Sequence, residues 1–271
     1  MNQTEKAVKF RALHSQDEVL LLPNCWDVVS ARTLKSCGFS AIATASASIA
    51  WSYGVSDGEG LSRDETLRVV SRICNGVDMP VSADIERGFG EKPRDVAITV
   101  KGVIEAGAVG FNIEDSGVPQ GQRDIEEMQS RIGAARDVCV KSGVDMYINA
   151  RADGYLLGNK GQTVFEDTVA RGKVWIAAGA DCVFIPGLAD VNIISDLKKA
   201  IAAPISVIVM DENTPTLNQL KMAGVCRVSM GPRTMQFVTG ALKGAMESMQ
   251  KDKDFRFMKG VPSFADVEKF S

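Results

Sequence analysis

Two carboxylates stand two residues apart at the end of an apolar run, in the segment Val81-Ser82-Ala83-Asp84-Ile85-Glu86-Arg87-Gly88-Phe89-Gly90. Residues two apart on an extended strand point to the same face, so Asp84 and Glu86 would project together where the chain leaves the strand. Neighbouring carboxylates repel unless a cation lies between them, and hard divalent ions bind oxygen ligands. The pattern favours a metal site. The alternative is a strand end with two solvated acids.

Other apolar runs also end in polar residues. Glu114 and Asp115 follow residues 110–113, Arg151 and Asp153 follow residues 146–150, and Ser46-Ala47-Ser48 and Asp57 follow residues 41–45. Asp84, Glu86 and Glu114 offer the oxygen ligands that Mg²⁺ prefers, with water and substrate completing its shell. Arg151 offers a planar fork for a carboxylate or a phosphonate. A metal ion and an arginine that face a small oxoacid would stabilise an enolate.

The sequence disfavours several other chemistries. His14 is the one histidine of the chain, which argues against histidine-based triads and histidine-rich zinc sites. No lysine stands at a predicted strand end, so a Schiff-base aldolase is disfavoured. The 6 cysteines are scattered and form no C-x-x-C pair, as expected for reduced thiols in a cytoplasmic protein.

Short apolar runs alternate with helical patterns along the chain. We expect strands over 19–22, 41–45, 81–84, 110–113, 146–150, 182–185, 205–210 and 226–230. We expect a first helix over 4–17, and then helices over 27–37, 62–75, 93–106, 122–142, 163–178, 190–200, 215–223 and 232–250, with a loop from 46 to 60. Eight strand–helix units predict a single α/β domain over residues 1–271, a (β/α)8 TIM barrel with a tail over 252–271.

A doubly wound open sheet is the alternative fold. Its nucleotide-binding form carries a G-x-G-x-x-G turn after the first strand, and the sequence lacks that turn. In a barrel, the catalytic groups lie at the carboxyl ends of the strands, where the acids and the arginine stand here.

Composition narrows the choice of partners. The formal net charge is −3 and 45% of the residues are hydrophobic, so a nucleic acid or an anionic membrane is not expected as a partner. No apolar run reaches the ~18 residues of a membrane span, and the first residues lack the apolar core of a signal peptide. We therefore expect a cytoplasmic protein.

Taken together, the motifs resemble the isocitrate lyase/phosphoenolpyruvate mutase superfamily, and most closely its phosphoenolpyruvate phosphomutase-like branch. The resemblance extends from about residue 20 to residue 232. It rests on Leu22-Pro23-Asn24, Gly54-Val55-Ser56-Asp57-Gly58-Glu59-Gly60, Ala83-Asp84-Ile85-Glu86-Arg87-Gly88-Phe89-Gly90, Gly110-Phe111-Asn112-Ile113-Glu114-Asp115-Ser116, Asn149-Ala150-Arg151-Ala152-Asp153, Phe184-Ile185-Pro186-Gly187 and Arg227-Val228-Ser229-Met230-Gly231-Pro232. The order and spacing of these segments make the resemblance specific.

The resemblance implies an Mg²⁺-dependent enzyme, with Mn²⁺ as a substitute, that breaks a C–C or P–C bond beside a 2-oxo or 2-hydroxy acid. Asp84, Glu86 and Glu114 would hold the metal ion, and Asp84 would also face the substrate. Arg151 would bind the substrate carboxylate, and Ser46 with Ala47 would bind its oxygens. Asp57 would act beside the metal ion. The resemblance also implies a homotetramer built as a dimer of dimers, in which the helix near 232–250 is exchanged between subunits.

The chain departs from the family in two places. The loop that carries Lys-Lys-Cys-Gly-His in isocitrate and methylisocitrate lyases reads Glu114-Asp115-Ser116-Gly117-Val118-Pro119-Gln120-Gly121-Gln122-Arg123, without the catalytic cysteine. The lysine- and asparagine-bearing segment of the mutases and phosphonopyruvate hydrolases is also not evident in this loop. In addition, Glu86 replaces the usual second metal-site aspartate.

These departures lead to three hypotheses. The first is a lyase or decarboxylase for an oxaloacetate-like acid, because decarboxylation needs enolate stabilisation more than a proton donor. The second is P–C chemistry on phosphonopyruvate, as a mutase or a hydrolase. The third is a barrel without catalysis that binds an oxoacid.

Overall fold

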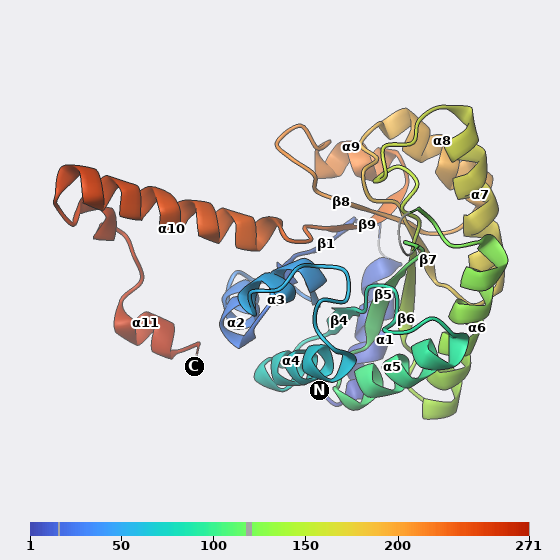
Figure 1. Ribbon diagram of the computed structural model, residues 1–271, viewed down its shortest axis with the longest axis horizontal. Helices are drawn as coiled ribbons and strands as arrows, with labels where there is room; N and C mark the ends of the chain where they lie inside the picture. Colours follow the sequence, from blue (N-terminus) through green and yellow to red (C-terminus); the bar gives the residue numbers. More distant parts are fainter. Residues whose placement is uncertain (16, 118–120, 271) are drawn as a thin grey trace.

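Parallel strands follow one another around a ring in the computed structural model, which describes residues 1–15, 17–117 and 121–270 (Figure 1). Within these residues the hydrogen-bonded order is β1-β9-β8-β7-β6-β5-β4-β3-β2. The strands are β1 (Leu20–Leu22), β2 (Asn24–Cys25), β3 (Ile42–Thr44), β4 (Val81–Asp84), β5 (Gly110–Glu114), β6 (Tyr147–Arg151), β7 (Cys182–Phe184), β8 (Ile205–Ile208) and β9 (Val225–Ser229).

Helices connect the strands and surround the ring (Figure 1). They are α1 (Gln3–His14), α2 (Val28–Ser36), α3 (Ser46–Ser52), α4 (Arg63–Gly76), α5 (Pro93–Glu105), α6 (Ile125–Ser142), α7 (Gln162–Ala177), α8 (Val191–Ile201), α9 (Leu217–Met222) and α10 (Arg233–Asp252). The predicted α/β barrel of parallel strands is confirmed, as a nearly closed barrel. None of the helices in the described ranges combines the length and the hydropathy needed to cross a membrane.

The barrel is interrupted at Pro23: β1 matches the strand predicted over 19–22, and the short strand β2 follows the proline and was not predicted. Proline has no amide hydrogen and cannot donate to a strand ladder. β1 pairs with β9 on one side of this break, and β2 pairs with β3 on the other. The side chain of Asn24 bridges the two sides: its Nδ2 donates to Thr44 O at 2.8 Å, and its Oδ1 accepts from Met230 N at 2.9 Å and Gly231 N at 2.8 Å.

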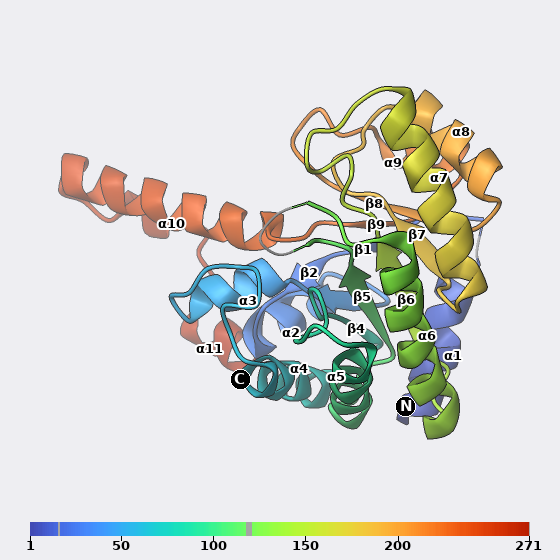
Figure 2. The ribbon, with the colours of Figure 1, turned by 45° about the vertical axis from the view of Figure 1, so that its right-hand side comes forward.

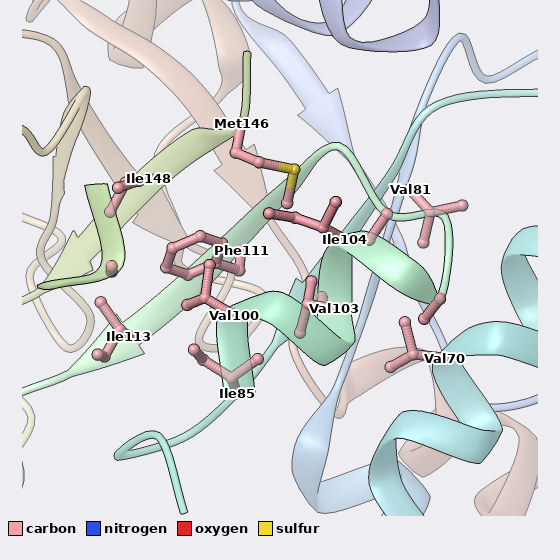
Figure 3. Close-up of a cluster of buried hydrophobic side chains, with 14 of the residues drawn as sticks. Val70, Val81, Ile85, Val100, Val103, Ile104, Phe111, Ile113, Met146 and Ile148 are labelled. Atoms are coloured by element: carbon pink, nitrogen blue, oxygen red, sulfur yellow. The ribbon is translucent and has the colours of Figure 1, made fainter. Parts of the chain in front are cut away.

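Alternate residues of each strand point into the barrel or out towards the helices, because the strand repeat is two residues. Phe111 and Ile113 of β5 face outwards and pack with Val100 and Val103 of α5 (Figure 3). Asn112, which lies between them in the sequence, faces inwards. The same alternation places polar residues of β4, β5 and β6 on the inner surface.

Helix α1 covers the amino-terminal end of the barrel. Phe10 is fully buried there, in a cluster with residues of several strands. The ring of His14 stacks on that of Tyr147, with 3.8 Å between centroids, and its Nδ1 lies 2.8 Å from Phe10 O. The carboxyl ends of the strands, where the acids and Arg151 stand, form the opposite end.

The structure corrects two details of the predicted elements. The stretch 46–60, predicted as a loop, begins with α3, and the helix predicted from 122 begins at Ile125. Ala45 and the serines of α3 carry no strong helix signal, and five of the seven residues of α3 are buried, so packing rather than propensity stabilises it. Val118, Pro119 and Gln120 of the predicted loop after β5 lie outside the described residues.

Helix α10 extends away from the barrel (Figures 1 and 2). No residue of α10 is buried, although Phe237, Val238 and Leu242 are large and apolar. The chain then continues through a 3₁₀ turn (Arg256–Met258) and α11 (Phe264–Glu268), and Arg32 Nη1 of α2 donates to Phe270 O at 3.0 Å. The predicted exchange of this helix between subunits is not shown by a single chain.

Candidate active site

A cavity of about 200 Å³ opens at the carboxyl ends of the strands. One part of its wall is polar and comes mainly from the β3–β6 side; it includes Asn24, Ser46, Asp57, Asp84, Asn112 and Arg151. The opposite part is largely apolar and comes from the β6–β9 side; it includes Leu156, Phe184, Pro186, Ile208, Met210 and Pro232, with Arg233 beside them. The cavity therefore offers acids and an arginine on the β3–β6 side, and hydrocarbon together with Arg233 on the β6–β9 side.

Asp84, at the end of β4, is held by two neighbours on the β3 side. Its own amide donates to Thr44 Oγ1 at 2.9 Å, and its Oδ2 accepts from Ser46 N at 3.3 Å. Burial, and then the charge of Glu114, raise the pKa of Asp84 to about 6. The carboxylate is thus fixed in position, yet its charge is poorly compensated by the protein.

Glu86 shares this electrostatic environment. Burial, and then the charges of Asp84 and Asp57, raise its pKa to about 8. The strand ends at Asp84, and Glu86 has a φ of 50°, so the two acids are not simply alternate residues of one strand as predicted. A φ in the left-handed region is costly for a residue with a Cβ and is often found at functional sites.

A second loop holds Glu86 in this conformation. Glu59, which also has a positive φ of 63°, donates its amide to Glu86 Oε2 and accepts from Phe89 N at 2.8 Å. Asp57 lies two residues earlier on the same loop and lines the cavity. Burial raises the pKa of Asp57, and a hydrogen bond from Ser46 opposes that rise.

Arg151 is clamped between two carboxylates. Its Nη1 lies 2.8 Å from Glu114 Oε2, and its Nε lies 2.6 Å from Asp153 Oδ1. Glu114 also accepts a hydrogen bond from Ser116 Oγ at 2.5 Å. Burial opposes the charge of Arg151, but Glu114 and Asp153 prevail and raise its pKa, so the guanidinium stays charged.

A buried ion pair supports Asp153 from behind. The fully buried carboxylate of Asp115 accepts from Asp153 N at 2.9 Å, from Gln122 Nε2 at 2.8 Å and from Arg171 Nη1 at 3.1 Å. Arg171, on α7, also donates to Arg123 O at 2.7 Å. This network joins the loops after β5 and β6 to one helix and so fixes the position of Arg151.

The structure brings most of the predicted site residues to one place. Ser46, Ala47, Asp57, Asp84 and Arg151 all line the cavity, whereas Glu86 and Glu114 lie beside it and interact with Asp84. Their roles remain predictions.

The donor set suits a hard divalent cation. Within residues 1–15, 17–117 and 121–270, no three His, Cys, Asp or Glu side chains are close enough together to hold a metal ion. The available groups are nonetheless carboxylate oxygens, and burial and mutual repulsion raise the pKa values of Asp84 and Glu86, so their ionised forms would gain from a further counter-ion. A cation such as Mg²⁺ would supply one.

Sequence reasoning assigned no role to Asn24 and Asn112, which line the cavity, and it favoured a helix cap over a ligand role for Arg233, which lines the cavity as well. Asn112 could have been found, because it stands two residues before Glu114 and therefore points to the same face of the strand. Asn24 could not, because its place depends on how the barrel closes.

The match to a family model covers residues 10–250, and the model is described as phosphoenolpyruvate phosphomutase. The chain belongs to the phosphoenolpyruvate mutase/isocitrate lyase superfamily. This superfamily includes lyases and mutases, and its membership agrees with the resemblance seen in the sequence.

Three relatives show how this superfamily member compares with known proteins. A Burkholderia cenocepacia structure, provisionally assigned as a phosphonomutase, is 38% identical with a TM-score of 0.87, over 91% of this chain and 99% of that one. The structure of 2,3-dimethylmalate lyase is 25% identical with a TM-score of 0.86, over 100% of this chain and 95% of that one. The 2-methylisocitrate lyase of Halalkalibacterium halodurans is 27% identical over 75% of this chain and 67% of its own length.

Proposed function

We propose that this superfamily member is an Mg²⁺-dependent lyase or decarboxylase that cleaves a C–C bond of a small 2-oxo or 2-hydroxy acid through an enolate. The observation that carries this proposal is the shared cavity, in which buried acids of high pKa face a clamped, charged arginine. Relatives in the same superfamily are named for C–C cleavage of substituted malate and isocitrate.

Each group of the chain has a task in this reaction. Asp84, Glu86 and Glu114 would hold Mg²⁺, which when bound withdraws electron density from the substrate oxygen beside the breaking bond. Arg151 binds the substrate carboxylate and orients it. Ser46 and Ala47 contact the substrate oxygens from α3. Asp57 lies in the same cavity outside the metal set and is the candidate for proton transfer.

Decarboxylation of an oxaloacetate-like acid illustrates the chemistry. The bond between C3 and the distal carboxyl carbon breaks, its electron pair moves into the 2-oxo group, and carbon dioxide leaves an enolate that then takes up a proton at C3. The chain needs no acid on the loop after β5 for the bond-breaking step. This agrees with the absence of cysteine and histidine from residues 114–123.

The test is to incubate the purified protein with Mg²⁺ and a panel of 2-oxo and 2-hydroxy diacids, with and without an alkyl substituent. Products are followed by mass spectrometry and by release of pyruvate or carbon dioxide. Matched reactions with Mn²⁺ and with EDTA show whether the metal is needed. No product from any acid of the panel would count against a lyase.

P–C chemistry on phosphonopyruvate is the second candidate, and the family model and the Burkholderia relative favour it. Phosphorus NMR of phosphonopyruvate incubated with the protein decides between the two. A barrel that binds an oxoacid without turnover is the third candidate, and would show a raised melting temperature but no product.

We also propose that α10 is exchanged between two copies of the chain. A groove of about 760 Å³ lies between α2 and the start of α10, lined by Trp26, Val29, Leu34, Phe237 and Val238 among others. The helix after the last strand would normally cover such a surface, but α10 extends outwards (Figure 2). Its apolar side chains are exposed. A second copy's α10 offers a matching apolar stripe. A dimer of such dimers would complete the expected tetramer.

A further inference from the structure

We infer that Asn112 binds an oxygen of the anionic substrate through its side-chain NH₂ group, and that Arg227 fixes the orientation of this amide. The inference rests on the proposed function, because it concerns the same cavity. Asn112 is 4% exposed and lines the cavity from β5. It pairs in register with Asp84 of β4 and Asn149 of β6, so the three side chains share one layer inside the barrel.

The carbonyl oxygen of Asn112 is fully occupied by donors from inside the barrel. It accepts from Arg227 Nη2 at 3.1 Å and from Asn149 Nδ2 at 2.8 Å. Farther along, Ser206 Oγ donates to Asn149 Oδ1 at 2.8 Å. A guanidinium can only donate, so the atom of Asn112 that faces Arg227 must be the oxygen. The arginine thus dictates the direction of each hydrogen bond in the chain.

The amide nitrogen of Asn112 is left for the cavity. Nothing in residues 1–15, 17–117 or 121–270 accepts a hydrogen bond from Nδ2, and this nitrogen is not among the buried polar atoms that lack a partner. It is therefore accessible, and the cavity is the accessible space that Asn112 lines. Two N–H donors at this place suit a carboxylate or enolate oxygen.

Arg227 is an independent sign that an anion belongs above it. Its side chain, on β9, is fully buried, and its Nε and Nη1 have no partner among the described residues. A buried charge without full pairing is costly to a fold. Its place below Asn112 and near Asp84 directs positive potential towards the cavity. Arg227 is a positioning residue that acts through Asn112.

The test measures oxalate binding by calorimetry in saturating Mg²⁺, with pyruvate and malonate as further probes. Asn112→Asp keeps the shape and the acceptor for Arg227, and Asn112→Ala removes the amide. We expect both variants to bind oxalate at least ~10-fold more weakly, as for loss of a hydrogen bond to a charged group. The Asp variant should melt no lower than the wild type, because its carboxylate pairs with Arg227.

Ser206→Ala is the matched control, since it changes the same chain of hydrogen bonds at its far end and leaves Asn112 fixed by Arg227. It should bind oxalate within ~3-fold of the wild type. Arg227→Lys, which keeps a charged donor, should bind more tightly than Arg227→Met. The inference is overturned if both Asn112 variants bind like the wild type, or if Ser206→Ala loses as much affinity as they do.

The same measurements separate the two proposals. A wild type that binds none of the three acids overturns both. Binding without turnover of any acid in the panel overturns the lyase alone, and leaves the role of Asn112 to be decided by its variants.

Discussion

The carboxylate of Asp84 lies among acids on three loops, and its pKa of about 6 is raised first by burial and then by Glu114. A buried carboxylate of this kind destabilises the protein when no cation is bound. It stabilises the complex of the protein with the cation when one is bound. The backbone amide of Asp84 donates to the Thr44 hydroxyl of β3, and its carboxylate accepts from the Ser46 amide of α3, so the position of the residue does not depend on the cation.

The variant Asp84→Asn tests whether the charge of Asp84 is costly without a cation and needed to bind one. We expect the variant to melt at the same or a higher temperature than the wild type without metal, because a buried charge is removed. The rise in melting temperature on addition of Mg²⁺ and oxalate should disappear, and so should turnover. Differential scanning fluorimetry measures the first two effects. Asp137→Asn, at an exposed position of α6, is the control and should respond to Mg²⁺ like the wild type.

The residues of the site were predictable to the extent that they stand at strand ends. Asp84, Glu114 and Arg151 follow apolar runs, and the barrel brings those ends together. Glu59 and Asn112 were not singled out. Glu59 holds the side chain of Glu86 through its backbone amide, so its residue type carries no signal. Asn112 carried a signal in its spacing from Glu114, which places both on one face of the strand.

Helix α7 contributes to the site through Arg171, although it lines no part of the cavity. The Arg171–Asp115 pair is buried on both sides, with exposed side-chain fractions of 8% and 0%. Loss of one partner would leave a buried charge unpaired, and the loops after β5 and β6 would lose their common anchor.

Arg171→Met is expected to lower the free energy of unfolding by about 3 kcal/mol or more, the usual cost of breaking a buried ion pair. Adding Asp115→Asn to the Arg171→Met variant should recover part of this loss, because the unpaired carboxylate is then neutral. Urea denaturation of both single variants and the double variant measures the coupling. Strictly additive losses would show that the pair does not act as a unit.

Helix α1 carries a titratable group into the opposite end of the barrel. Burial, and then the charge of Arg227, lower the pKa of His14 to about 3. The unfolded chain takes up a proton near pH 6.5, whereas the folded chain does not until much lower pH. The contribution of His14 to the free energy of unfolding is therefore fully present above the pKa of the unfolded chain, and it is lost as the pH falls below that value.

Between pH 7 and pH 5 this single group should cost the wild type about 2 kcal/mol of unfolding free energy. His14→Phe keeps a flat ring against Tyr147 and cannot titrate. The free energy of unfolding of this variant should therefore fall by about 2 kcal/mol less than that of the wild type between pH 7 and pH 5. Urea denaturation at the two pH values measures the difference. Equal losses in both proteins would mean that His14 becomes protonated in the folded state.

At the scale of the whole molecule, the alternation of strands and helices was predictable because each strand is short, apolar and followed by an amphipathic helix. The split of the first strand was not, because a proline can end a strand or, as here, interrupt one that continues. The course of α10 was also beyond sequence patterns, since an apolar stripe on a helix does not tell which surface it covers.

Leu242→Glu tests the exchange of α10. The side chain is 60% exposed in one chain and would be buried in a partner's groove, where a carboxylate is costly. We expect the variant to have a lower mass than the wild type in light scattering after size exclusion, with an unchanged circular dichroism spectrum. Lys243→Gln, on the neighbouring exposed position, should leave the mass unchanged. Identical masses for wild type and Leu242→Glu would argue against the exchange.

The break at Pro23 has a consequence for local unfolding. Elsewhere the ring is closed by backbone ladders, but here Asn24 takes their place: its Oδ1 accepts from the amides of Met230 and Gly231, and its backbone oxygen accepts from Thr234 Oγ1. At about 1 kcal/mol each, these are the contacts that opening must break. The amides of Met230 and Gly231 lie directly before α10, so they should exchange with deuterium before those of the central strands. The barrel can thus loosen beside its outgoing helix while the acids and Arg151, on the far strands, keep their geometry.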